Sequence, residues 1–116
     1  MPKPLFIWKK SCSTCRTAKK FLHELVGDDA FDDRELNANP MSTEELDLLI
    51  GQHDYKLFLN SRNELYRERK MKENPPPRAE ALKLMAANPN LVKRPLLVKG
   101  GRIVLGFDAE EMEKLL

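Results

Sequence analysis

The chain has 116 residues, which suits one domain, and its 41% of apolar residues is enough to form a hydrophobic core. Its 20 basic and 18 acidic residues leave a net charge of only +2, so the composition gives no general signal for nucleic-acid binding. No apolar run approaches the roughly 18 residues of a membrane span, and the first residues lack the apolar segment of a signal peptide. We therefore expect a cytoplasmic protein that contacts neither nucleic acid nor membrane directly.

The first third of the chain alternates strand and helix patterns. The apolar run Leu5–Trp8 predicts a short buried strand, and the apolar spacing over about residues 13–26 predicts a helix that ends at Gly27. A second strand is predicted within Phe31–Leu36. Because most of its residues are charged, this strand suits the edge of a sheet better than the centre.

The middle of the chain, about residues 42–88, is predicted to be helical. Ser42 is followed three residues later by Glu45, a spacing typical of the capping box that starts a helix. Ser61 and Glu64 have the same spacing, so they predict a second helix start. These signals describe a helical segment placed between two strand-containing parts of the chain.

Three consecutive prolines, Pro75–Pro77, forbid a helix and separate this second helix from a third, over about residues 78–87. The spacing of its apolar residues predicts which side chains of the third helix face inward. They are Ala79, Leu82, Met85 and Ala86.

Two apolar runs follow near the end of the chain. Leu96–Val98 and Ile103–Leu105 flank a turn with two glycines, which predicts an antiparallel hairpin, and a final helix is predicted to begin at Asp108. The first two strands are joined by a helix and should lie parallel. We therefore predict an α/β (α+β) fold, a single thioredoxin-like domain over residues 1–116. Its mixed four-stranded sheet is interrupted in sequence by a helical insert at about residues 42–88.

Two cysteines, Cys12 and Cys15, lie where the first strand ends and the first helix begins. Unpaired backbone N–H groups and the helix dipole stabilise a thiolate there, and such settings lower a thiol pKa from roughly 8.5 to about 3.5–7.5. Cys12 is therefore the predicted nucleophile. Cys15 is within disulfide reach, and it is either the resolving thiol or a packed helix residue. Only His23 and His53 add further nitrogen ligands, so neither a zinc site nor a tightly bound cofactor is expected.

Three stretches of the chain resemble the arsenate reductase family known as ArsC/Spx. The resemblance spans nearly the whole chain and implies a thioredoxin-like fold with a helical insert. It also implies a cis peptide bond before Pro95. The matching stretches are Cys12–Ala18, Leu59–Arg62 and Asn88–Val98, the last followed by Gly106–Phe107.

The resemblance also implies roles for single residues. It implies that Cys12 is the nucleophile and that Arg62 and Arg94 help to bind an oxyanion. If this fold holds, Arg62 and Arg94 converge on the cysteine motif, which Arg16 follows directly, and guanidinium groups suit an oxyanion. The other predicted binding residues are Ser13 and Thr14, whose hydroxyl groups can donate hydrogen bonds to the thiolate, and Pro95, which the resemblance implies to precede a strand that faces the cysteine loop.

The chain departs from the arsenate reductases of this family in several places. A third arginine near Gly106 is missing, Cys15 replaces a non-cysteine residue, and Lys9–Lys10 replaces an Asn-Pro pair. The Cys12-x-x-Cys15 motif is similar instead to the redox switch of the Spx-type regulators, which bind RNA polymerase.

Three functions follow as hypotheses. The favoured one is a monomeric thiol-dependent oxidoreductase of the arsenate-reductase type, which reduces an oxyanion or a glutathione disulfide. Its reductant would be glutathione, thioredoxin or glutaredoxin. The alternative is an Spx-like redox-sensing regulator that binds the alpha subunit of RNA polymerase. The third hypothesis is an inert relative in which Cys12 has lost its role.

Overall fold

The computed structural model describes residues 3–116. Contacts along the chain divide it into two compact units. One unit contains the described residues up to Asn39 together with Arg94–Leu116, and the other is Pro40–Lys93. The predicted helical insert lies inside the second unit. None of the helices in the described part of the chain is both long and apolar enough to cross a membrane.

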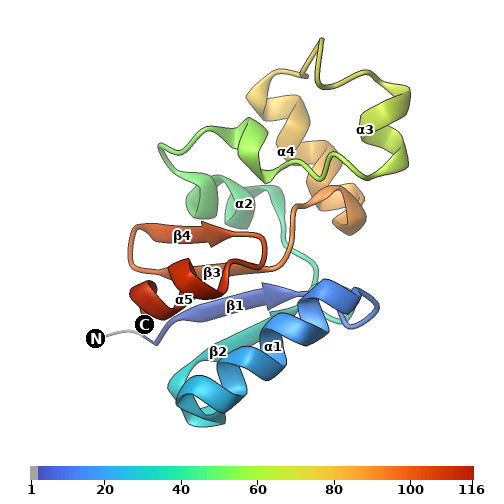
Figure 1. Ribbon diagram of the computed structural model, residues 1–116. Coiled ribbons are helices and arrows are strands. Elements are labelled where there is room, and N and C mark those ends of the chain that lie inside the picture. Colours follow the sequence, from blue (N-terminus) through green and yellow to red (C-terminus); the bar gives the residue numbers. More distant parts are fainter. Residues whose placement is uncertain (1–2) are drawn as a thin grey trace. The chain divides into compact units, whose positions relative to one another are not determined.

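The first unit is built on a four-stranded sheet with the order β2-β1-β3-β4 (Figure 1). Strand β1 pairs in parallel with β2 and antiparallel with β3, which forms a hairpin with β4. This arrangement confirms the predicted mixed sheet, and it confirms that the charged strand β2 lies at an edge. The strands are β1 (Leu5–Trp8), β2 (Asp32–Glu35), β3 (Leu96–Lys99) and β4 (Arg102–Leu105).

Two helices, α1 (Ser13–Val26) and α5 (Ala109–Leu115), pack on one face of this sheet. Helix α1 ends at Gly27 as predicted, with a φ of 84° that favours glycine. Side chains from both helices and from alternate positions of the central strands form a single buried cluster. Its members are Phe6, Trp8, Cys15, Ala18, Leu22, Phe31, Leu97, Met112 and Leu115.

The indole of Trp8 is fixed within this unit by polar contacts as well as by packing. Its Nε1 donates a hydrogen bond of 2.8 Å to the Asp33 carboxylate. The Lys19 ammonium lies 4.2 Å from the centroid of the same ring and 3.6 Å from the Asp33 carboxylate. The side chain is 9% exposed, which confirms the prediction that Trp8 belongs to the core.

The second unit is helical, as predicted. The capping box at Ser42 and Glu45 is confirmed, because the Ser42 hydroxyl accepts the Glu45 N–H and the Glu45 carboxylate accepts the Ser42 N–H, each at 3.1 Å. The helices of the unit are α2 (Thr43–Ile50), α3 (Glu64–Glu68) and α4 (Arg78–Ala87), with 3₁₀ turns at Tyr55–Phe58 and Pro89–Leu91.

The predicted capping box at Ser61 is wrong. Helix α3 is capped by Asn63, whose side-chain oxygen accepts the Leu65 N–H at 2.9 Å. The preceding turn is stabilised by Asn60, whose side chain accepts the Arg62 N–H at 3.1 Å. Because asparagine makes such local turns well, the helix begins two residues later than the Ser61 spacing indicates.

The prediction for the inward face of helix α4 is partly wrong. Leu82 and Met85 are buried as expected, whereas Ala79 is exposed and Ala81 takes a buried position instead. Small apolar residues occur around most of this helix, so their spacing alone did not distinguish the two faces.

Candidate active site

Cys12 is the N-cap residue of helix α1, with an extended backbone conformation. Its Sγ accepts the backbone N–H of Cys15 at 3.4 Å, so the sulfur takes the place that a serine or aspartate oxygen usually has at a helix start. The backbone of Cys12 is held on both sides, because its N–H donates to the Lys9 carbonyl and its carbonyl accepts the Arg16 N–H. The strand-to-helix junction therefore directs a half-buried thiol at unpaired helix N–H groups.

The loop before Cys12 is fixed by two side chains. The Glu35 carboxylate, at the end of β2, accepts the N–H groups of Lys10 at 2.9 Å and of Ala38 at 2.8 Å. The Arg16 guanidinium donates a hydrogen bond of 2.8 Å to the Lys10 carbonyl. The Arg16 side chain thus lies along the loop backbone, where it supports the position of Cys12, and a direct role in anion binding stays a prediction.

The two thiols lie in opposite electrostatic environments. Partial burial alone would raise the pKa of Cys12. Hydrogen bonds from the Cys15 thiol and N–H, together with the nearby Arg94 guanidinium, outweigh this effect and leave that pKa below its ordinary value of 9.0. Cys15 is fully buried, and burial with the hydrogen bond and charge of Cys12 raises its pKa to about 12. The site therefore holds one thiol that ionises readily and one that stays protonated.

Arg94 reaches the site from a position two residues before β3. It contributes both a positive charge and a side-chain hydrogen bond to Cys12. The Arg94–Pro95 peptide bond is cis, which confirms the expectation drawn from the family resemblance. Pro95 is buried, and its carbonyl accepts the Gly106 N–H at 2.8 Å.

Three other predicted site residues are exposed. Ser13 and Thr14 are exposed in the first turn of α1. Arg62 is exposed in the second unit, where its carbonyl accepts a hydrogen bond from Arg67. Their predicted contacts with the thiolate or a bound anion stay predictions.

The structure adds Lys9, to which the sequence analysis assigned no role in the site. Its side chain is only 5% exposed, and it interacts electrostatically with both cysteines. The one sequence signal for this residue was the departure from the Asn-Pro pair of the related reductases.

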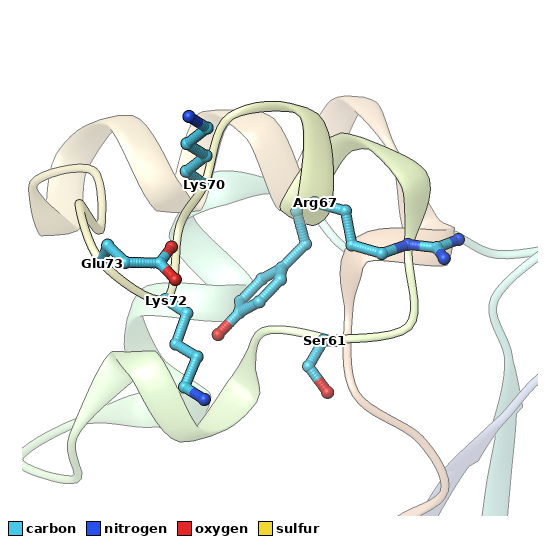
Figure 2. Close-up of a pocket in the computed structure, with 6 residues that line it drawn as sticks. Ser61, Arg67, Lys70, Lys72 and Glu73 are labelled. Atoms are coloured by element: carbon cyan, nitrogen blue, oxygen red, sulfur yellow. The ribbon is translucent and has the colours of Figure 1, made fainter.

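The second unit contains a pocket of about 750 Å³ that includes none of the predicted cysteine-site residues. Figure 2 shows Lys70 and Arg67 pointing away from one another, with Lys72 extending in a third direction. Because these cations point in different directions, they do not together mark an anion site in this pocket. Its lining residues are Ser61, Tyr66, Arg67, Lys70, Lys72 and Glu73.

Comparison with known proteins identifies the family. The model of the ArsC family matches residues 7–115. The chain belongs to the ArsC family. Two solved structures are similar over almost their whole length. An ArsC family related protein from Bacteroides fragilis is 35% identical, with a TM-score of 0.80 and 98% of each chain covered. A possible arsenate reductase from Streptococcus mutans is 31% identical, with a TM-score of 0.75 and coverage of 97% of this chain and 99% of that one.

A relative with a different description also matches this ArsC-family chain. The global transcriptional regulator Spx of Enterococcus faecalis is 27% identical over 91% of this chain and 80% of its own. The predicted ArsC/Spx family and thioredoxin-like fold are therefore confirmed. The proteins similar to this chain include a possible arsenate reductase and a transcriptional regulator, so the choice between these functions depends on the chemistry of the site.

Proposed function

We propose that this ArsC-family protein is a cytoplasmic thiol-dependent oxidoreductase in which Cys12 is the nucleophile. The observation that supports this function is the asymmetry of the two thiols. Cys12 is partly accessible and has a lowered pKa, whereas Cys15 is buried and has a pKa of about 12. A nucleophilic thiolate beside a protonated partner is the arrangement that thiol–disulfide exchange requires.

The reaction with a disulfide begins when the Cys12 thiolate attacks one of its sulfurs. A bond forms between Cys12 and that sulfur, the substrate S–S bond breaks, and the first thiolate leaves with the electron pair and takes a proton from solvent. Cys15 then loses its proton and attacks the Cys12 sulfur. This forms the Cys12–Cys15 disulfide and releases the second thiolate. Two electrons have moved to the substrate, and glutathione, thioredoxin or glutaredoxin returns two to the pair.

The order of these steps follows from the coupling between the thiols. A hydrogen bond and a negative charge from Cys12 contribute to the raised pKa of Cys15. Both contributions disappear once the Cys12 sulfur belongs to a mixed disulfide. The pKa of Cys15 therefore falls at the stage at which Cys15 has to act as a nucleophile.

The substrate should be anionic. The N-terminus of α1 and the Arg94 guanidinium both favour negative charge near Cys12, as carried by arsenate or by the carboxylates of glutathione. With arsenate, Cys12 attacks arsenic and water leaves. A second thiolate then attacks the Cys12 sulfur, and the S–As electron pair reduces As(V) to As(III).

The test compares the wild-type chain with Cys12→Ser and Cys15→Ser. Reduction of oxidised glutathione is followed with coupled consumption of NADPH, and arsenate reduction is followed with thioredoxin or glutaredoxin recycling. We expect no turnover from Cys12→Ser, and a trapped glutathione adduct on Cys12 in Cys15→Ser. Equal turnover in wild type and Cys12→Ser, or none in wild type with either substrate, would overturn the proposal.

An Spx-like regulator is the second candidate, supported by the likeness to Spx and by the paired cysteines. In this case the two cysteines sense oxidation and the partner is the alpha subunit of RNA polymerase. A pulldown with that subunit under reducing and oxidising conditions tests it. Binding that depends on the redox state supports this candidate, and its absence in both states removes it.

A further inference from the structure

Lys9 is the one polar or charged residue that is buried among residues 3–116, with 5% of its surface exposed. Lysine is almost never fully buried unless its charge has partners, because removing an ammonium from water is costly. The neighbouring Lys10 is exposed, as a lysine at the end of a strand normally is. The burial of Lys9 therefore needs an explanation within the site.

The backbone of Lys9 connects it to both cysteines. Its carbonyl accepts the Cys12 N–H at 3.1 Å, and its N–H forms a hydrogen bond with the Cys15 sulfur. Since Lys9 directly follows β1, its position is fixed by the sheet on one side and by the cysteine loop on the other. The backbone of Lys9 is therefore fixed next to both cysteines.

The electrostatic neighbours of Lys9 come from three parts of the same unit. Burial and the Arg94 guanidinium lower the pKa of Lys9 from its ordinary value of 10.5, while Glu35, Cys12 and Cys15 raise it. Of these groups, Arg94 stays charged at all working pH values and Cys15 has a pKa of about 12. Glu35, whose pKa is lowered by the Lys10 N–H, is ionised near neutral pH. Lys9 is therefore the cation of this group that loses its charge at a lower pH than an ordinary lysine does.

We propose that Lys9 is a positioning residue of the redox site, whose charge stabilises the Cys12 thiolate and attracts anionic reactants to it. The second part of this inference rests on the proposed function, since it concerns the substrates of the same site. Arg94 supplies a constant charge and Lys9 a titratable one, so the attraction for anions should decline as Lys9 loses its proton.

The test measures the rates at which Cys12 reacts with two alkylating agents between pH 6 and pH 10. Iodoacetamide is neutral and reports the thiolate population, whereas iodoacetate is an anion and also reports the local positive charge. Lys9→Met should lower the ratio of iodoacetate to iodoacetamide rates about fivefold near neutral pH. In the matched control Lys10→Met, the ratio should change less than about twofold because that charge is exposed and screened.

Lys9→Arg provides a second measurement that does not depend on the stability of Lys9→Met. In wild type the rate ratio should fall as the pH rises toward 10.5, the ordinary pKa of lysine, because the pKa of Lys9 lies below that value, and in Lys9→Arg this decline should disappear because arginine keeps its charge. A decline of the same size in both proteins would overturn the inference. So would a folded Lys9→Met, verified by circular dichroism, whose rate ratio equals that of wild type or of Lys10→Met.

The alkylation experiment requires no turnover. A protein that reduces neither disulfides nor arsenate would contradict the proposed function and leave the measured effect of Lys9 on Cys12 intact. Conversely, an active protein with unchanged rate ratios in the Lys9 variants would contradict this inference alone.

Discussion

The difference between the two thiols predicts how selectively they are alkylated. The pKa of Cys12 lies below 9.0 and that of Cys15 at about 12, so at pH 7 the thiolate population of Cys12 exceeds that of Cys15 by at least about a thousandfold. A thiolate of lower pKa is less nucleophilic, with a Brønsted coefficient of about 0.5, which reduces the expected rate ratio to about 30. The complete burial of Cys15 increases the ratio further.

Labelling of the reduced, folded protein with limiting iodoacetamide at pH 7 measures this ratio directly, when each cysteine-containing peptide is quantified by mass spectrometry. We expect Cys12 to react at least about 30 times faster than Cys15, by the thiolate populations and Brønsted coefficient above. In the matched variant Cys12→Ser, Cys15 should stay almost unlabelled until the protein is denatured. Comparable labelling of both cysteines in the folded chain would refute the proposed thiol asymmetry and the mechanism built on it.

Three further predictions concern stability, each measured as the free energy of unfolding from urea titrations followed by circular dichroism. Above pH 9 the unfolded chain loses the Cys15 proton while the folded chain, with a pKa of about 12, keeps it. Under reducing conditions the free energy of unfolding of wild type should therefore fall by about 1 kcal/mol more than that of Cys15→Ala between pH 9 and pH 10. If the free energy of unfolding depended on pH equally in both proteins, the raised pKa of Cys15 would be contradicted. Because Asn63 caps helix α3, Asn63→Ala should lower the free energy of unfolding by about 1 kcal/mol, and Ser61→Ala should lower it by less than about 0.5 kcal/mol. A larger effect of Ser61→Ala than of Asn63→Ala would favour Ser61 as the cap. Leu22→Ala should cost about 2.7–5 kcal/mol because Leu22 is fully buried. The partly exposed Leu25 is its control, and an equal cost at Leu25→Ala would contradict the assigned core face.

The sequence predicted the elements whose signals are local. The helix of residues 13–26 and its end at Gly27 follow from apolar spacing and from a glycine that adopts a positive φ. The cap at Ser42 follows from a reciprocal pair of side chains three residues apart. The thiol at a strand-to-helix junction was predictable for the same reason, because the unpaired N–H groups of a helix start belong to the backbone.

Other features depend on competition between signals or on contacts distant in sequence. The Ser61 spacing predicted a cap, but Asn60 and Asn63 make stronger local turns in the same segment. The position of the Arg16 guanidinium depends on the Lys10 carbonyl, and the N–H of the same residue is bonded to Glu35, which is distant in sequence. Burial of Lys9 contradicts the usual preference of lysine for solvent, so no pattern in the sequence favoured it.

The environment of Trp8 has a spectroscopic consequence. It is the only tryptophan in the chain, and it shares a buried cluster with Cys15 while its indole N–H is bonded to Asp33. The emission of an indole depends on nearby charges and on sulfur groups that quench its excited state. Oxidation of the cysteine pair changes the sulfur chemistry within this cluster. The fluorescence of the unlabelled protein should therefore follow its redox cycle in real time.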